Sequence, residues 1–234
     1  YNCSVHSGMG GQINTNSTFG SSNFDGSIQT RVSENTTAGF NIVQYTGNNV
    51  NDETFGHGLG STPHMIIIKN AGADVNWRIY HQDLTASNII FFNNGEQSAP
   101  GAHGNGYVKT VSSTTYSTYT GNSDSLGVNG NGNSMIAYCF REIPGYSKFG
   151  TYQGNGSADG PFVYTGFKPR WLMWKRITDA GYDWDMYDAE RDTYNVAFKE
   201  LLANGNGAES SATVLAVDLL SNGFKLRTSN GNGN

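Results

Sequence analysis

Apolar residues in this chain form short runs and alternations typical of β-strands, and the most distinctive pattern occurs twice. Residues 65–68 (MIII) and 171–174 (WLMW) are continuous apolar runs, each preceded by a glycine and a proline and followed by a lysine. Runs without polar alternation predict strands that are covered on both faces. Residues 77–81 (WRIYH) alternate instead, and this pattern predicts a strand with one buried face.

The two apolar runs belong to an internal repeat. Pro63 and Pro169 are 106 residues apart, and Trp77 and Trp184 are 107 residues apart. This period is well above that of solenoid units, so it predicts tandem whole domains. Asn-Gly turns between the apolar segments favour antiparallel hairpins.

These patterns divide the chain into three parts with different expected roles. Residues 1–38 are interpreted as the end of a preceding repeat plus an Asn/Ser/Thr/Gly connector with one edge strand at 25–32, residues 39–143 as a first β-sandwich repeat, and residues 144–234 as a second. The second repeat has no counterpart of the strand predicted at 134–140 (SMIAYCF), which would leave an unpaired sheet edge unless residues beyond Asn234 or another chain fill it. Residues 193–203 fit one or two helical turns.

Composition supports this β interpretation and narrows the function classes. Charged residues make up 14% of the chain and aromatic residues 12%, with 31 glycines but only 5 prolines. The net charge of −5 offers no basic stripe for nucleic acid, and no apolar run is long enough for membrane insertion. We expect an all-β protein of two tandem antiparallel β-sandwich modules, jelly-roll or lectin-like, with one short helix in the second.

Cysteine and histidine give no sign of a metal centre. Cys3 and Cys139 are interpreted as buried thiols and not as a disulfide, because each fits the closing strand of a repeat. Four of the five histidines have no metal-ligand spacing and no nucleophile motif beside them, so they are interpreted as surface residues: His57, His64, His81 and His103.

The densest acidic stretch follows Gly181. Asp183, Asp185 and Asp188 could supply oxygen ligands to Ca²⁺, but no EF-hand-like loop surrounds them. The favoured alternative is a solvated strand end with Arg191 as the counter-charge. A glycosidase needs two paired carboxylates, and the sequence shows no defensible pair. No catalytic residue and no cofactor is therefore expected.

Aromatic residues are the one feature with a positive functional interpretation. Trp77 with Trp184, and Tyr80 with Tyr187, recur at the repeat distance and are expected to be core positions. Aromatic residues without a counterpart could stack against sugar rings, and the candidates for glycan binding are Trp171, Trp174, Tyr116 and Tyr119.

Most of the chain resembles an uncharacterised tandem β repeat of tail-fibre and structural proteins of marine bacteriophages, including those that infect cyanobacteria. The segments that carry this resemblance are residues 38–47 (AGFNIVQYTG), 56–60 (GHGLG), 136–140 (IAYCF), 145–150 (GYSKFG), 154–167 (GNGSADGPFVYTGF) and 221–227 (SNGFKLR). The resemblance implies a virion location and a non-enzymatic role, and it brings no catalytic residues.

The sequence thus predicts a virion structural protein, such as a tail fibre, spike or surface decoration, that displays β-sandwich modules on the virion surface or outside the cell. Expected partners are other virion proteins, a host cell-surface glycan and copies of itself, for which a trimer is the common arrangement in such fibres although no heptad run is present. Two other classes remain open, a polysaccharide-degrading enzyme and a non-viral extracellular lectin-like module.

Overall fold

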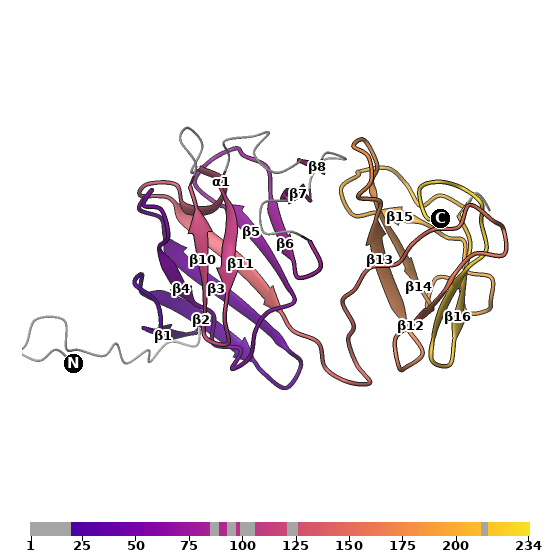
Figure 1. Cartoon of the computed structure of the whole chain (residues 1–234), viewed down its shortest axis with the longest axis horizontal. Helices are drawn as coiled ribbons and strands as arrows, with labels where there is room; N and C mark the ends of the chain where they lie inside the picture. Colours follow the sequence, from indigo (N-terminus) through magenta and orange to yellow (C-terminus); the bar gives the residue numbers. More distant parts are fainter. Residues whose placement is uncertain (1–19, 85–88, 93–96, 99–105, 121–125, 212–214) are drawn as a thin grey trace, which may run out of the picture. The chain divides into compact units, whose positions relative to one another are not determined.

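The computed structural model describes residues 20–84, 89–92, 97–98, 106–120, 126–211 and 215–234. The described residues fall into two compact units (Figure 1). The described residues within 1–87 and 100–141 form unit 1, and those within 88–99 and 142–234 form unit 2. Nearly all regular structure is β-strand, which confirms the predicted all-β class. Within the described ranges, no helix is both long enough and apolar enough to span a bilayer.

Unit 1 is a sandwich of two antiparallel sheets around one apolar core (Figure 1). Its larger sheet has the strand order β1-β2-β3-β11-β5-β6, with bounds Ser21–Asn23, Thr30–Asn35, Phe40–Thr46, Ser134–Phe140, Met65–Asn70 and Arg78–His81. The smaller sheet has the order β4-β10-β9, with bounds Thr54–Gly56, Thr115–Tyr119 and Tyr107–Val111. Both sheets contribute side chains to the same core, so the layers face each other.

Alternation along the strands explains the core of unit 1. In β11, Met135, Ala137 and Cys139 are fully buried, while the residues between them are only partly buried. Strand β11 is central, because it pairs with β3 on one side and with β5 on the other. Cys139 is a free buried thiol, as predicted, whereas Cys3 lies outside the described residues.

The predicted connector is partly wrong, because residues 20–35 belong to the first sandwich. Strand β2 pairs with β3, and Val32 lies in the core with Ile28 packed against it. The Thr30 hydroxyl also donates to the Gly56 carbonyl at 2.8 Å. Low average apolar content suggested a linker, but pairing needs apolar residues only at the few inward positions.

His57 is buried, which contradicts its predicted surface position. The Leu59 N–H donates to His57 Nδ1 at 3.1 Å, and His57 Nε2 lies 3.2 Å from the Ser112 carbonyl oxygen. Nδ1 is thus an acceptor and Nε2–H a donor, which is the pattern of a neutral ring. Burial lowers the pKa of His57, because the charged ring would lose its hydration.

We predict that unit 1 loses stability as the pH falls through the ordinary histidine pKa of about 6.5. Below this pH the unfolded chain binds a proton at His57, whereas the folded unit keeps the ring neutral. The stability that neutral His57 contributes is therefore fully present above this pH and falls below it. Urea unfolding at several pH values should show that the unfolding free energy of unit 1 falls less on acidification in His57→Gln than in the parent chain. Equal pH profiles for the two proteins would contradict this role of His57.

The predicted helix at residues 193–203 is wrong. The Ala197 N–H donates to the Val217 carbonyl at 2.8 Å, and the Glu200 N–H donates to the Ser210 carbonyl at 2.9 Å. These donors are used in β-bridges and so are not available to the helical i−4 carbonyls. Among the described residues, the helical segment is α1 (Leu126–Asn129) in unit 1.

Unit 2 is a smaller sandwich with its own core. One sheet has the order β12-β17-β16, with bounds Phe162–Tyr164, Gly223–Leu226 and Val217–Leu220. The other has the order β13-β14-β15, with bounds Trp171–Lys175, Trp184–Asp188 and Leu201–Leu202. The paired strands β7 (Ile89–Phe91) and β8 (Gln97–Ser98) group with this unit, and the Trp184 Nε1–H donates to the Phe91 carbonyl at 2.9 Å.

The strands that the two units have in common share their order and register. Ile67 pairs with Ile79 across β5–β6, and their sequence counterparts Met173 and Met186 pair across β13–β14. In the second sheets, β4-β10-β9 corresponds to β12-β17-β16, and both contain an antiparallel hairpin next to a third strand. The repeat in the sequence is therefore a repeat of fold.

The sequence counterpart of β3 forms no strand in unit 2. Residues 147–153 correspond to β3, yet beyond the isolated Ile143–Ser147 bridge they carry no strand. In unit 1, β3 is held between β2 and β11, and the described part of unit 2 has a counterpart of neither. Within the described residues, no β-strand therefore lies beside this segment to form a ladder with it.

Candidate functional site: a depression in the second sandwich

A shallow open depression of about 610 Å³ lies on unit 2. Its lining consists of Ala158, Asp159, Val196, Phe198, Ala216 and Arg227. The Arg227 N–H donates to the Ala216 carbonyl at 2.8 Å, which joins the two ends of the β16–β17 hairpin at the depression. The remaining residues come from the 155–159 turn and from the loop after β14, so three separate segments build the site.

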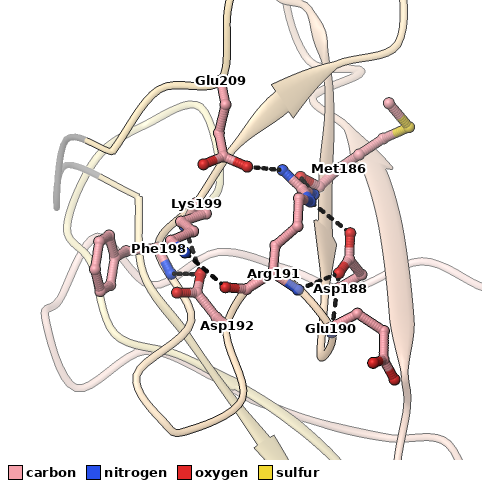
Figure 2. A network of polar contacts seen from close by, with 8 residues as sticks. All are labelled: Met186, Asp188, Glu190, Arg191, Asp192, Phe198, Lys199 and Glu209. Atoms are coloured by element: carbon pink, nitrogen blue, oxygen red, sulfur yellow. Dashed lines mark hydrogen bonds and ion pairs between the residues drawn. The ribbon is translucent and has the colours of Figure 1, made fainter.

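One carboxylate binds two backbone amides of the loop that carries Phe198. Asp192 accepts the Phe198 N–H at 2.8 Å and the Lys199 N–H at 2.6 Å (Figure 2). The Lys199 ammonium donates in turn to the Arg191 carbonyl at 2.8 Å. The Phe198 ring points away from these polar contacts in Figure 2, so the polar network fixes the backbone and leaves the ring for the depression.

Arg191 is the hub of the same network. Its Nε contacts Asp188 at 2.5 Å, its second nitrogen contacts Glu209 at 3.3 Å, and a third donates to the Met186 carbonyl at 3.2 Å (Figure 2). Burial disfavours the Asp188 carboxylate, but the hydrogen bonds from Arg191 outweigh burial and lower the pKa of Asp188. The predicted pairing of Arg191 with the acidic stretch is confirmed for Asp188.

Opposite charges meet at the rim of the depression. Asp159 lies 2.9 Å from the Lys225 ammonium and 3.4 Å from the Arg227 guanidinium, which also reaches Asp218 at 3.3 Å. The hydrogen bond from Lys225 lowers the pKa of Asp159, so the carboxylate stays ionised. The rim therefore offers both hydrogen-bond donors and acceptors beside the apolar Phe198.

This combination suits a neutral polar ligand. An aromatic ring can cover the C–H face of a sugar, while a carboxylate and a guanidinium bind its hydroxyl groups. Because Asp159 and Arg227 balance each other's charge, the rim favours neither an anion nor a cation.

The four predicted glycan-stacking residues are in different environments, and the lining contains none of them. Tyr116 is 0% exposed and Trp174 is 8% exposed, so burial contradicts a surface role for both. Trp174 stacks on Tyr187 at 4.8 Å between ring centroids. Tyr119 is partly buried against Tyr107, at 5.1 Å between centroids. Trp171 is 55% exposed and is the one of the four that fits the surface prediction.

The three aspartates proposed as calcium ligands do not converge. Asp185 and Asp188 point to opposite faces of β14, because their positions differ by an odd number of residues. Asp188 is committed to Arg191, and Asp183 accepts from the Asn204 amide at 2.6 Å. Within the described ranges, no group of three or more His, Cys, Asp or Glu could hold a metal ion.

Sequence reasoning missed a buried carboxyl group. Asp185 is only 3% exposed and lies on the core face of β14 beside Tyr187, whose hydroxyl donates to Glu200 at 3.1 Å. Burial, and then the hydrogen bond with Glu200, raises the pKa of Asp185 to about 8. The prediction of a solvated strand end is therefore wrong at Asp185. The sequence alone could have predicted this burial, because Asp185 lies on the same strand face as Tyr187, a repeated residue that was expected in the core.

Comparison with known proteins leaves the function open. Neither the curated proteins nor the solved structures contain a match to the chain. One family model matches residues 14–234, which is nearly the whole chain and includes both sandwiches. The chain belongs to the family described as Domain of unknown function (DUF7483).

Proposed function

We propose that this chain is a non-catalytic structural protein of a bacteriophage virion, a tail fibre, spike or surface decoration, whose β-sandwiches display a host-binding surface. One observation carries the non-catalytic part of the proposal: the scaffold is repeated, whereas its polar chemistry is not. The strand registers of the two units agree, but Arg78 of unit 1 corresponds to Asp185 of unit 2, and His81 corresponds to Asp188. If the two units had arisen from a duplicated enzyme, at least one catalytic residue of unit 1 should have a recognisable equivalent in unit 2.

The host-binding half of the proposal rests on the depression of unit 2. It combines the apolar Val196 and Phe198 with the charged pair Asp159 and Arg227, and this is the lining expected of a weak saccharide site. Repeated display of such sites on copies of the chain would convert weak single contacts into avidity. Other virion proteins and further copies of the chain are the assembly partners of this proposal.

A polysaccharide-degrading enzyme is the alternative that a specific observation favours. Asp185 has the raised pKa of a general acid and lies next to a second carboxyl group, Glu200. However, Asp185 is buried in the core, and neither residue lines the depression. We therefore assign this pair to packing and not to catalysis. A non-viral lectin-like module would use the same saccharide site as the proposed virion protein, but it would act outside the cell and not on a virion.

The host-binding part of the proposal is tested by measuring how the purified chain binds to host cells and to a glycan array. Phe198→Ala is expected to weaken binding about tenfold, because the ring supplies the apolar face of the site. Tyr194→Ala is the matched control, because Tyr194 is an aromatic residue of the same loop that lies outside the lining. Its binding should equal that of the parent chain. A blank array together with unbound host cells would remove the adhesion proposal.

Two further readouts separate the alternatives. Turnover of host polysaccharide by the parent chain, lost in Asp185→Asn, would favour the enzyme over the structural protein. Mass spectrometry of purified particles should detect the chain, and its presence only in particle-free supernatant would favour the lectin-like module.

A further inference from the structure

The depression is one end of a larger surface, the outer face of the sheet β12-β17-β16. Residues at alternate positions of these strands point into the core of unit 2, and the residues between them point outward. Strand pairing places Phe162, Lys225 and Asp218 in one row across this outer face. The depression adjoins this row, because its lining includes Ala216 and Arg227, which lie two positions along the chain from Asp218 and Lys225.

Two exposed aromatic rings lie at the other end of this outer face. Phe162 and Tyr164 of β12 are 45% and 66% exposed, and they share the outward side because they are two residues apart. The Phe162 ring lies over Gly223 of the neighbouring strand, where an added Cβ would come within 2.9 Å of the ring. The Tyr164 hydroxyl reaches back to Gly166, where an added Cβ would lie 3.6 Å from it. Because Gly223 has no side chain, the Phe162 ring can lie along the sheet surface as a platform.

Unit 1 has no aromatic ring at the equivalent positions. There Thr54 stands in place of Phe162, and Gly56 stands in place of Tyr164. The Ser27 N–H donates to the Thr54 hydroxyl at 2.8 Å, so part of the chain before β3 covers this place in unit 1. The exposed rings of unit 2 are therefore an addition to the repeated scaffold, which is expected of a binding feature and not of the fold.

Four charged side chains lie between the aromatic platform and the depression. Asp159 contacts Lys225 at 2.9 Å and Arg227 at 3.4 Å, and Arg227 contacts Asp218 at 3.3 Å. Two carboxylates balance two cations, so this strip attracts neither a polyanion nor a polycation. A protein surface would strip water from these charges at a cost. Sugar hydroxyl groups can instead donate to the carboxylates and accept from the cations, as water does.

The distance between the two apolar ends sets the length of the ligand. Phe162 lies on β12, and Phe198 lies on the segment whose Ala197 bridges to Val217 of β16, which is three strand spacings away. At about 4.8 Å for each spacing, the two ends are roughly 14 Å apart. A single sugar ring can cover only one end, so a linear chain of several rings is needed to contact both.

We propose that the outer face of the sheet β12-β17-β16 binds a linear, uncharged oligosaccharide that crosses the strands, with one ring on Phe162 and Tyr164 and another in the depression beside Phe198. The inference rests on the proposed host-binding function and adds a second aromatic subsite to the depression. The aromatic faces cover the C–H faces of the two outer sugar rings, and the charged strip binds the hydroxyl groups between them.

Calorimetric titration with glycans of increasing length tests the inference. The probes are the uncharged linear glycans of the array, ordered from monosaccharide to octasaccharide, and the protein is the whole chain. The affinity should rise at least about tenfold once the glycan spans both ends, because the second stacking contact then adds to the first. Monosaccharides should bind in the depression alone.

Variants separate the two ends of the site. Phe162→Ala should weaken binding of the long glycans about five- to tenfold and leave binding of the short ones unchanged, whereas Phe198→Ala should weaken both. Phe162→Tyr keeps the aromatic face and should bind as the parent chain does. Trp171→Ala is the matched control, because it removes an exposed aromatic ring from the other sheet of unit 2. Urea unfolding checks the stability of unit 2, and Phe162→Leu, which still covers Gly223 but has no flat ring, replaces an unstable Phe162→Ala.

Four results would overturn the inference. Equal affinity for short and long glycans, or unchanged binding of long glycans in Phe162→Ala, would confine the site to the depression and leave the proposed function intact. Tighter, salt-sensitive binding of polyuronates or sulfated glycans would contradict an uncharged ligand. A change of sedimentation in Phe162→Ala would assign the face to a second copy of this chain. Absence of binding to every uncharged glycan would also remove the inference, and the host-binding proposal falls with it only if host cells remain unbound.

Discussion

Replacing Tyr116 with alanine should lower the unfolding free energy of unit 1 by about 3–5 kcal/mol, the range for deleting a buried aromatic side chain. Tyr116 is fully buried and stacks on Phe55 with 5.3 Å between ring centroids. Its partner across β4–β10 is Phe55, just as Phe224 is the partner of Val163 across β12–β17. Urea unfolding, monitored with a separate probe in each unit, would measure the loss of stability in unit 1. Unit 2 should unfold as it does in the parent chain.

Two controls separate a core role for Tyr116 from a binding role. Tyr116→Phe should cost far less, because the corresponding residue Phe224 has no hydroxyl group. Trp171→Ala should leave stability nearly unchanged, because that side chain is more than half exposed. If Tyr116→Ala kept its stability and lost glycan binding, the surface interpretation would replace the core interpretation.

Unit 2 should lose stability as the pH rises from about 4 to 8, by a few kcal/mol. The pKa of Asp185 is raised in the folded unit to about 8, whereas an unfolded aspartate titrates near 4. Between these values the folded unit holds a proton that the unfolded chain releases, so stability is full at low pH and falls as the pH rises. The opposite trend is predicted for unit 1 from His57.

Asp185→Asn supplies the control for this pH dependence. The amide keeps hydrogen-bonding capacity without titrating, so unit 2 of the variant should be nearly insensitive to pH over this range. Thermal unfolding of both proteins at pH 5 and pH 8 gives the comparison. An unchanged slope in Asp185→Asn would mean that another group controls the pH response.

The hairpin that contains the apolar runs was predictable because its signal is local. Residues 65–68 and 171–174 are flanked by the same glycine, proline and lysine, and the repeat distance of 106–107 residues also describes the observed register. Strand register depends on which residues face inward, and that information is carried by the alternation itself.

The positions of single aromatic residues were less predictable. Tyr116 was treated as unrepeated because its counterpart is a phenylalanine, Phe224, at a slightly different distance along the chain. Trp174 replaces an isoleucine of unit 1, so it has no aromatic counterpart and was expected at the surface, although its strand position faces the core. In both cases the strand face was more informative than the residue type.

The depression could not be derived from sequence. Its lining comes from the 155–159 turn, the loop after β14 and the ends of the β16–β17 hairpin, which meet only after folding. Phe198 was assigned to a helix because its neighbours have helical spacing, but Asp192 and two β-bridges fix this loop in a different conformation. Long-range backbone pairing of this kind overrides local periodicity.

Cross-strand proton contacts in the two hairpins test most directly whether one scaffold is built twice. Facing residues without mutual hydrogen bonds have α-carbons about 4.5 Å apart, close enough for an Hα–Hα nuclear Overhauser effect. Ile67 should show this effect with Ile79, and Met173 should show it with Met186. An effect from Met173 to Tyr187 or Asp185 would reveal a one-residue slip, and the two units would then not share a fold.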